Sequence, residues 1–424
     1  MEYPKIVQVE VTNKCNFNCI MCIRSTWSVK TGNMDFKLFR KIARESFQYS
    51  EKIDLYGMGE PLLHPDLLRM VRLAKECNRD AEIFISTNGS LLSPEIAIKL
   101  FEAGLTSVSF SIDSSDLSQL AKIRRGAEPS IILRNLKSTA AMKNKYSAEV
   151  GIEFVAFKDN YRDIPGIVEM AGKLELDYVV VSNVIPYTKE FYEMAVYLTL
   201  SSKPFKVARS APEYGWDLIR LPSYKLLSEV YGRSINTEIE RVRNGFWSEA
   251  AKYGYWVNLP LLIESKERIK LAEDTLRYVE KASRIASQYG IRFEQPKLIP
   301  DSKDRECPYV VEEATVVRAD GAVAPCFEFL YTHPLFVNNH QKIVKAVNFG
   351  NVRQKSILDI WNSDEYVEFR DARRRLSTTT PWCGDCPYSS LDCWFVKDNS
   401  LDCYGNSPSC SECLYSVGVS KCQI

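Results

Sequence analysis

The sequence lacks a long apolar run, a charge excess and a targeting segment. None of its apolar stretches approaches the ~20 residues that a helix needs to cross a bilayer. Lys and Arg number 55 and Asp and Glu number 54, whereas nucleic-acid-binding proteins usually carry an excess of basic residues. The first residues enter an apolar stretch without the pattern of a signal peptide. We therefore expect a cytoplasmic protein that binds neither nucleic acid nor membrane.

Histidine is also scarce, whereas cysteine is abundant. The chain has three histidines and 13 cysteines, and disulfides are rare in a reducing cytoplasm. Cys15, Cys19 and Cys22 lie close together near the start, and Cys77 stands alone on the apolar face of an expected helix, where it is expected to be a core residue. The remaining cysteines fall in the C-terminal third, at Cys307, Cys326, Cys383, Cys386, Cys393, Cys403, Cys410, Cys413 and Cys422. Clustered thiolates with few imidazoles are typical of iron–sulfur clusters or of zinc.

Six apolar, β-rich stretches alternate with amphipathic ones in the first half of the chain. The expected strands are Ile6–Val11, Ile53–Tyr56, Ile83–Ser86, Val108–Ile112, Ile152–Phe157 and Tyr178–Ser182. Near-continuous apolar runs are typical of strands buried on both faces of a parallel sheet. We therefore predict an α/β fold, a partial (β/α)6 TIM-like barrel. The expected domains are this core (1–185), a mostly helical insertion (186–300) and a cysteine-rich iron–sulfur domain (301–424).

Two long helices are expected outside this core, at Glu264–Ser287, closed by Gly290, and at Ile357–Arg374. The last ~40 residues carry too little apolar volume for a conventional core, so metal ligation is expected to hold them.

The three N-terminal cysteines follow the first expected strand directly. They therefore belong to a loop at the carboxyl end of that strand, where folds of this type place their chemistry. Three thiolates bound to a 4Fe–4S cluster leave one iron open for an external ligand, whereas a structural zinc site requires a fourth ligand close by. The alternative, a zinc loop, has no such ligand nearby in the sequence.

The run Cys15-Asn16-Phe17-Asn18-Cys19-Ile20-Met21-Cys22 resembles the cluster-binding loop of the radical S-adenosylmethionine (radical SAM) enzymes. In that family the methionine moiety of S-adenosyl-L-methionine ligates the open iron, and an electron from the cluster releases a 5′-deoxyadenosyl radical. The resemblance implies both cofactors here. Met21 stands where the family usually has an aromatic residue, and a Met side chain can also cover an apolar ring face.

The ends of the next strands resemble the SAM-binding elements of the same family. Gly57-Met58-Gly59-Glu60-Pro61 resembles the turn that receives the methionine ammonium, and Arg124 is implied to pair with the methionine carboxylate. The full implied set of SAM-binding residues is Met58, Gly59, Glu60, Pro61, Asn88, Ser111, Asp113, Arg124 and Asn183. Tight turns and strand-end caps would explain the same residue types without a cofactor.

The C-terminal cysteines resemble the SPASM extension, which carries auxiliary 4Fe–4S clusters in radical SAM enzymes. Cys307, Gly321 and Cys326 fit its spacing, but the tail departs from it and has two extra cysteines. The resemblance implies one auxiliary cluster on Cys307, Cys326 and Cys403 and a second on Cys383, Cys386 and Cys393. Cys410, Cys413 and Cys422 would complete them in an order that the resemblance does not fix. Zinc stays an alternative for part of the tail, because Cys383/Cys386 and Cys410/Cys413 have zinc-knuckle spacing.

The resemblance implies an enzyme that abstracts hydrogen from a peptide or protein side chain, with Glu328 as the candidate catalytic base. The segment Asp402–Leu414 looks most like the cofactor-modifying proteins associated with tungsten-containing aldehyde:ferredoxin oxidoreductases, so maturation of such an enzyme is the specific variant. A ferredoxin or flavodoxin type of protein is the expected reductant. Two other classes stay open: a non-enzymatic iron–sulfur electron carrier or scaffold, and a zinc-stabilised binding module.

Overall fold

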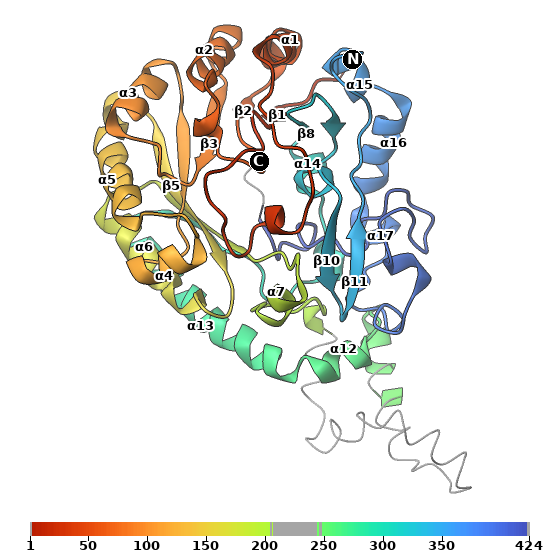
Figure 1. The fold of residues 1–424 in the computed structure, drawn as a ribbon. Coiled ribbons are helices and arrows are strands. Elements are labelled where there is room, and N and C mark those ends of the chain that lie inside the picture. The colour runs from red at the N-terminus through yellow and green to blue at the C-terminus, as the bar shows by residue number, and fades with distance from the viewer. Residues whose placement is uncertain (1, 204–205, 207–243, 246–247, 422–424) are drawn as a thin grey trace, which may run out of the picture.

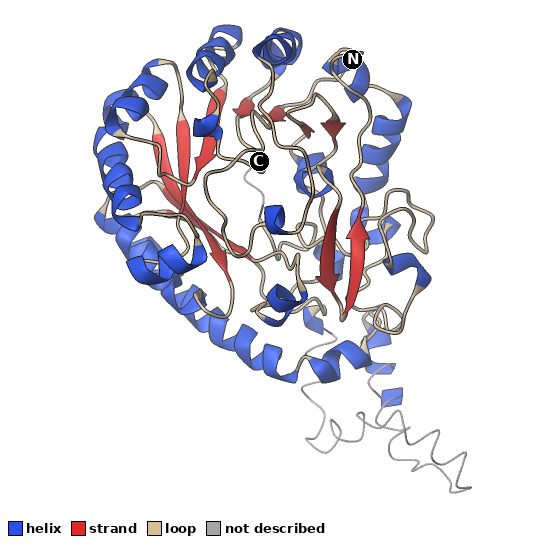
Figure 2. Cartoon of the chain, viewed as in Figure 1, coloured by secondary structure: helices blue, strands red, loops and turns tan. Residues whose placement is uncertain are grey.

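The computed structural model describes residues 2–203, 206, 244–245 and 248–421. Part of the expected helical insertion and the candidate ligand Cys422 therefore lie outside the described residues. Within the described part, a nine-stranded sheet curves through the molecule and helices cover its outer side (Figure 1, Figure 2). None of the helices in that part combines the length and the apolarity needed to cross a bilayer.

The sheet contains the six expected strands as consecutive neighbours. They are β1 (Ile6–Val9), β2 (Lys52–Asp54), β3 (Glu82–Thr87), β4 (Ser107–Ser111), β5 (Glu149–Ala156) and β6 (Tyr178–Asn183). Each runs parallel to the next, with register pairs such as Val7 with Ile53 and Val108 with Val150. The predicted α/β fold with a parallel sheet is confirmed.

Three short strands that the sequence did not indicate extend this sheet. β7 (Arg292–Glu294) adds in parallel to β6, and β8 (Ala314–Val317) adds in parallel to β1. β9 (Val323–Ala324) then pairs antiparallel with β8. The cysteine-rich region is thus joined to the edge of the core sheet through β8. The domain limits 1–185, 186–300 and 301–424 stay a prediction.

Burial explains why these segments form strands. All four side chains of β1 are buried, and so are five of the six in β6. A parallel sheet needs cover on both faces, and here helices supply it on the outside (Figure 2). The helices of the first half are α1 (Phe36–Ser46), α2 (Leu67–Cys77), α3 (Pro94–Glu102), α4 (Leu117–Ile123), α5 (Pro129–Tyr146), α6 (Ile164–Lys173) and α7 (Lys189–Glu193).

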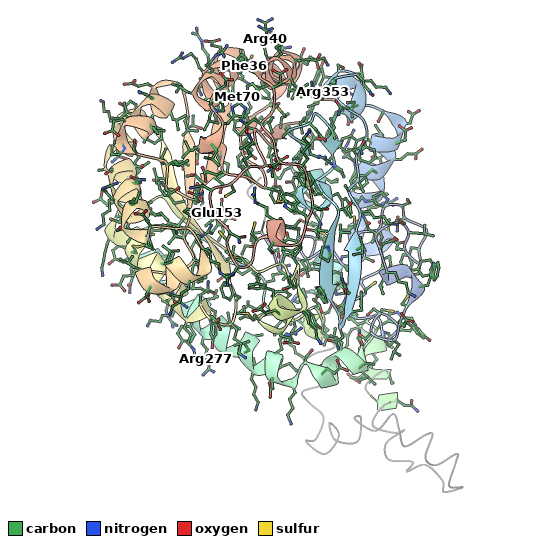
Figure 3. All side chains as sticks on the ribbon, in the orientation of Figure 1. Phe36, Arg40, Met70, Glu153, Arg277 and Arg353 are labelled. Carbon is green, nitrogen blue, oxygen red and sulfur yellow. The ribbon has the colours of Figure 1, made fainter. Side chains whose placement is uncertain are left out.

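The expected helix at Glu264–Ser287 is present as α13 (Lys266–Tyr289), preceded by α12 (Leu259–Glu264). It ends at Gly290, whose φ of 68° is the left-handed conformation in which glycine pays no steric penalty. Its buried stripe, which includes Ala282 and Ala286, packs against α6. The charged residues between the stripe positions face outward, as Arg277 does in Figure 3.

The C-terminal region combines short helices with an antiparallel hairpin. The hairpin pairs β10 (His333–Val337) with β11 (His340–Val344). The helices are α14 (Pro308–Val311), α15 (Ile357–Trp361), α16 (Asp364–Arg373) and α17 (Leu376–Thr379). The prediction of one helix over Ile357–Arg374 was wrong, because Ser363 stands at a new N-cap and divides the segment into α15 and α16.

Candidate active site and cysteine sets

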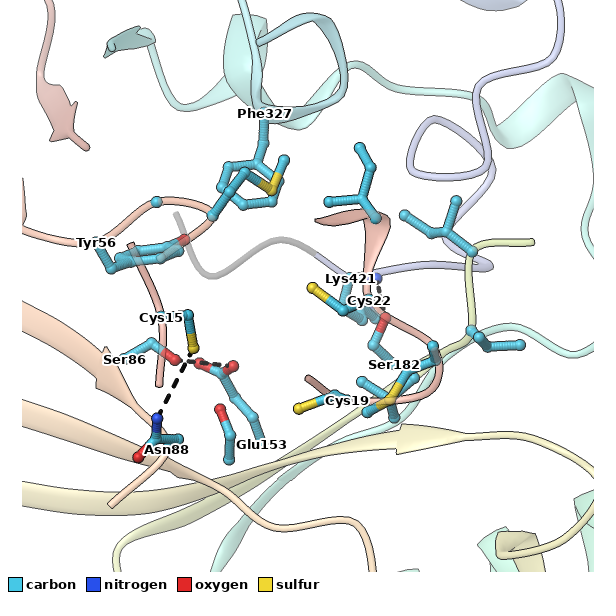
Figure 4. Close-up of a pocket in the computed structure, with 18 of the residues that line it drawn as sticks. Cys15, Cys19, Cys22, Tyr56, Ser86, Asn88, Glu153, Ser182, Phe327 and Lys421 are labelled. Carbon is cyan, nitrogen blue, oxygen red and sulfur yellow. Dashed lines mark hydrogen bonds between the residues drawn. The ribbon is translucent and has the colours of Figure 1, made fainter. Parts of the chain in front are cut away.

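The N-terminal cysteine loop faces a cavity of about 310 Å³. The loop follows β1 and is held by backbone hydrogen bonds from Asn18 N to Arg125 O (2.9 Å) and from Ile20 N to Ile123 O (3.0 Å). Cys15, Cys19 and Cys22 all line the cavity, and Figure 4 shows their thiols directed into the same space. The loop therefore presents three thiols together at the carboxyl ends of the parallel strands.

The three thiols are shielded from water and lie within electrostatic reach of one another. Burial raises the pKa of Cys19 to about 11, and the charge of Arg124 opposes that rise. Burial also raises the pKa of Cys15 and of Cys22. Bare thiols here are protonated at neutral pH, whereas a cluster needs thiolates, so cluster binding releases protons.

The Gly57–Pro61 turn passes very close to the strand beside it. A Cβ atom on Gly59 would lie 2.4 Å from the carbonyl oxygen of Lys14, and one on Gly57 would lie 2.3 Å from Cγ of Glu10. The turn therefore requires glycine at both positions and leaves backbone on the cavity wall. Gly57, Met58, Gly59 and Glu60 line the cavity, whereas Pro61 is buried at the start of a short 3₁₀ helix and does not.

Glu60 is fully engaged with the neighbouring strand ends. Its carboxylate accepts hydrogen bonds from Thr87 Oγ1 (2.7 Å), Asn88 N (2.7 Å) and Leu62 N (3.1 Å). Burial raises the pKa of Glu60, and the Asn88 N–H opposes that rise. A carboxylate has about four acceptor sites, so the bond from Asn88 leaves one of them open on Oε2. Its role toward a ligand ammonium stays a prediction.

Arg124 and Asp113 form a buried ion pair, with 2.8 Å between Nε and Oδ2. Burial alone would lower the pKa of Arg124, but Asp113 raises it above its usual value. Arg124 lines the cavity and Asp113 does not. Asp113 instead accepts from Val155 N at 2.8 Å, so it lies behind Arg124 as its support.

The other predicted SAM-binding residues, Ser111, Asn88 and Asn183, also line the cavity. Asn88 Nδ2 lies 4.0 Å from Cys15 Sγ, as drawn in Figure 4. Asn183 donates from Nδ2 to the carbonyl of Val419 at 3.0 Å and so ties β6 to the C-terminal tail. The structure thus gathers seven of the nine predicted residues around one cavity with the thiols, and places Pro61 and Asp113 just behind them.

Sequence reasoning missed Glu153, which lies on the cavity floor. Its Oε2 accepts from Ser86 Oγ at 3.1 Å, and its Oε1 is buried without a hydrogen-bond partner. Burial raises the pKa of Glu153 to about 7. Figure 3 shows it inside the ring of strands. The available signal was a single charged residue within the apolar strand Ile152–Phe157.

Lys421 and several aromatic residues complete the mouth of the cavity. The backbone N–H of Lys421 donates to Ser182 Oγ at 3.0 Å (Figure 4). The aromatic lining side chains are Phe17, Tyr56, Phe154, Tyr187, Tyr309, Phe327 and Tyr415. The C-terminal region therefore supplies part of the cavity wall, with Lys421 near Cys22 in Figure 4.

Glu328, the predicted catalytic base, is not among the residues that line this cavity. Its Oε1 lies 3.4 Å from Nε2 of His333. Burial opposes protonation of that imidazole, but Glu328 raises the pKa of His333 overall. The structure thus places Glu328 in a buried pair outside the cavity wall.

The tail thiols fall into two neighbouring sets. In the first set, burial raises the pKa of Cys307 to about 12, and the charge of Cys410 adds to that rise. Burial and then the charges of Cys307, Cys413 and Cys410 raise the pKa of Cys326. The first set therefore consists of Cys307, Cys326, Cys410 and Cys413.

The second set lies toward the surface. Burial raises the pKa of Cys403, with further contributions from Asp402, Cys386 and Cys393. Burial is also the main cause that raises the pKa of Cys383, and Cys386 adds to it. The second set is thus Cys383, Cys386, Cys393 and Cys403. Cys403 was expected with Cys307 and Cys326, whereas the cysteine charges that act on it come from Cys386 and Cys393. Its assignment to a cluster stays a prediction.

Within the described residues, no three His, Cys, Asp or Glu side chains form a group that could hold a metal ion as the atoms stand. The solitary Cys77 has a different setting. It closes α2 and is half-buried against the main core.

Two family models match the chain. The model of the radical SAM superfamily matches residues 9–171. The model of the SPASM iron–sulfur cluster-binding domain matches residues 307–387. The chain therefore contains a radical SAM domain and a SPASM domain. The two assignments imply 4Fe–4S clusters and S-adenosyl-L-methionine as cofactors, so the iron–sulfur interpretation holds over zinc.

Similar proteins support the same assignment. The chain is 29% identical over 426 residues to the "Tungsten-containing aldehyde ferredoxin oxidoreductase cofactor-modifying protein" of Pyrococcus furiosus, covering 99% of this chain and 97% of that one. Its fold is similar to that of Streptococcus suis SuiB bound to S-adenosylmethionine (TM-score 0.51, 15% identity, 93% of this chain and 72% of that one). It is equally similar to SuiB bound to the precursor peptide SuiA (TM-score 0.51, 15% identity, 92% and 71%).

The residues present fit these cofactors. Three thiols share one cavity wall, and the Gly57–Gly59 turn leaves room where any side chain would collide with the segment that follows β1. The cavity also contains a buried carboxylate oxygen of Glu153 with no protein partner. Such a polar, shielded cavity beside three thiols suits a ligand that carries both charged groups and hydroxyls.

Proposed function

We propose that this radical SAM enzyme matures the cofactor of a tungsten-containing aldehyde oxidoreductase. The observation that carries the proposal is the length of the match to the Pyrococcus furiosus cofactor-modifying protein, which covers 99% of this chain, cysteine tail included. Modification of a peptide or protein side chain is the second candidate. It is supported only by the class of domain, since the likeness to SuiB concerns the fold.

In the proposed site, Cys15, Cys19 and Cys22 hold a 4Fe–4S cluster with one open position. When bound there, the cluster and S-adenosyl-L-methionine supply a 5′-deoxyadenosyl radical. The protein's part is to bind, orient and exclude water. Arg124, fixed by Asp113, offers its guanidinium to a carboxylate, and the Gly57–Glu60 backbone together with Glu60 Oε2 receives an ammonium. Ser111, Asn88 and Asn183 complete the cavity wall toward the nucleoside.

The two tail sets of four thiols are proposed to hold two fully ligated auxiliary clusters. Four protein thiolates per cluster leave no open iron, so these sites would conduct electrons or support the fold and would not bind S-adenosyl-L-methionine. A ferredoxin or flavodoxin type of protein is the proposed reductant. Because thiolates must stay reduced to bind iron, we also propose a reducing, cytoplasmic compartment.

The substrate class is tested by producing a tungsten aldehyde oxidoreductase in cells with and without this chain. The expected result is an oxidoreductase whose extracted cofactor differs in mass between the two cultures, while its polypeptide mass is unchanged. A matched control uses the Cys19→Ala variant, which should give the same cofactor as the culture without the chain. An altered polypeptide with an unaltered cofactor would favour peptide modification and contradict the proposal.

A further inference from the structure

Arg305 is buried between the two tail cysteine sets without a carboxylate partner. Its side chain is 3% exposed. The guanidinium donates from Nη2 to Cys410 O (2.8 Å) and from Nη1 to Thr380 O (2.9 Å) and Pro381 O (3.0 Å). Its Nε donates to Ser416 Oγ at 3.4 Å, so the hydrogen bonds of this guanidinium in the described structure go to neutral groups. A buried cation bonded only to neutral groups costs several kcal/mol unless a negative charge lies close.

The groups that can supply this negative charge are cysteines of both sets. Burial lowers the pKa of Arg305, and the charges that oppose this come first from Cys413, then from Cys410, Cys383 and Asp385. The backbone agrees with this placement, because Cys383 N donates to Ser411 O at 3.1 Å and so brings the start of the second set against the Cys410–Cys413 segment. The guanidinium also lies 5.0 Å from the ring of Trp382, the residue before Cys383.

The nearby acidic side chains are already occupied. Asp385 accepts from Ser201 N (2.7 Å), Ser201 Oγ (2.6 Å) and Ser302 Oγ (2.8 Å). Glu412 is paired with Lys342 at 3.1 Å, so that pair adds no net charge. Asp385 keeps its negative charge because these partners are neutral, but Arg305 donates its hydrogen bonds to carbonyls and not to that carboxylate.

A second buried guanidinium lies on the other side of the first set. Arg373 is 4% exposed and donates to the carbonyls of Phe369 and Pro408. Its charge lowers the pKa of Cys307, against a larger rise caused by burial. Arg373 is not among the main causes that change the pKa of Cys383 or of Cys403. Arg373 is thus linked to the first set, whereas the thiols whose charges act on Arg305 belong to both sets.

We infer that Arg305 is the shared counter-cation of the two auxiliary sites and raises the reduction potential of both. Reduction adds one negative charge to a cluster, and a fixed cation nearby in a medium of weak screening stabilises the more negative form. The same charge favours thiolates over thiols when iron binds. The inference rests on the proposed ligand role of the two cysteine sets.

The test is a redox titration of the anaerobically isolated, cluster-loaded protein, followed by electron paramagnetic resonance. Arg305→Gln should lower the potential of both auxiliary clusters. A loss of about tenfold in the equilibrium constant corresponds to about 59 mV for one electron. Arg373→Gln should lower only one of the two, and the cluster on Cys15, Cys19 and Cys22 should keep its potential throughout. Arg374→Gln, which removes the same charge from an exposed neighbour paired with Asp371, should leave all three unchanged.

Arg305→Lys separates the effect of the charge from that of the hydrogen bonds, because lysine keeps the positive charge but lacks the planar guanidinium with its fixed donors. It should keep the auxiliary iron and hold both potentials near those of the unaltered protein. If Arg305→Gln loses auxiliary iron, retention in Arg305→Lys supports the inference, and loss in both variants overturns it. Unshifted potentials in a fully loaded Arg305→Gln variant also overturn it. Absence of auxiliary iron from the unaltered protein would contradict the proposed function first, and the inference with it.

Discussion

The two ends of the chain use cysteine in different surroundings. Near the N-terminus, three thiols follow a buried parallel strand and face a cavity lined by the ends of neighbouring strands. In the described part of the tail, eight thiols make up the two proposed sets of four, in a region whose last part consists mainly of turns. We propose that the first arrangement leaves a coordination position open beside a cavity and that the second closes both sites with protein ligands.

The fixed cations differ in the same way. Arg124 at the N-terminal site is balanced by Asp113, so it can orient a ligand carboxylate without adding net charge to the protein. Arg305 in the tail donates its hydrogen bonds to neutral groups, and burial lowers its pKa against the charges of Cys413, Cys410, Cys383 and Asp385. At the N-terminal site, a carboxylate balances the charge of the buried arginine. In the tail, the charge of Arg305 is available to the two proposed clusters, which are anionic.

The two ends should differ most when one thiol is removed from each. Cys19→Ala should abolish formation of 5′-deoxyadenosine from S-adenosyl-L-methionine under strong reduction, because no other site has an open position. Cys386→Ala, which alters a closed site, should retain some of this cleavage while losing product. Chromatography of the reaction mixture measures both. Cleavage that survives in Cys19→Ala would place the radical source elsewhere.

Removal of Arg124 should have the next largest effect, on folding. Arg124→Ala leaves Asp113 buried and unpaired, and breaking a buried ion pair in this way costs about 3–5 kcal/mol. Chemical unfolding of the cluster-loaded protein measures the loss. The exposed neighbour in Arg125→Ala is the matched control and should cost little. A loss in Arg124→Ala no larger than in Arg125→Ala would show that Asp113 has another partner.

Glu153 should make stability depend on pH. The pKa of its carboxyl is about 7 in the folded chain, against an ordinary value of 4.5. The folded state therefore binds the extra proton between these values, and the free energy of unfolding falls as pH rises from about 4.5 through about 7. Glu153→Gln should be more stable than the unaltered protein by about 3 kcal/mol at pH 8 and by less at pH 6. Equal unfolding curves at pH 8, measured without S-adenosyl-L-methionine, would contradict the burial of this charge.

Glu60→Ala should have the smallest of these effects, on ligand affinity. Loss of a hydrogen bond to a charged group is worth about 1.5–3 kcal/mol, or roughly tenfold to a hundredfold in the dissociation constant of S-adenosyl-L-methionine. Equilibrium dialysis measures the affinity, and normal iron content serves as the control for folding. Unchanged affinity would leave Glu60 as a support for Thr87 and Asn88 only.

The sequence predicted most of the core and less of the tail, for physical reasons. Strands such as Tyr178–Ser182 can be predicted from a local apolar run. The strands Arg292–Glu294 and Ala314–Val317 are short, and each forms by pairing with a strand that is distant in the sequence. Spacing located the thiols but did not bring Cys403 within electrostatic reach of Cys386, because that placement depends on how the turns after Asp402 fold back. Glu153 was overlooked because it is the one charged residue of an expected strand that is otherwise apolar, and its direction toward the cavity depends on the folded sheet.

Iron and acid-labile sulfide analysis of the anaerobically isolated protein tests the central claim most directly. Three 4Fe–4S clusters require about 12 iron atoms per chain. A variant with alanine at Cys15, Cys19 and Cys22 should retain about eight, and a variant with alanine at Cys383, Cys386, Cys393 and Cys403 should also retain about eight, including those of the N-terminal site. Loss of all iron in either variant, or tightly bound zinc in the unaltered protein, would contradict one open three-thiol site beside two closed four-thiol sites.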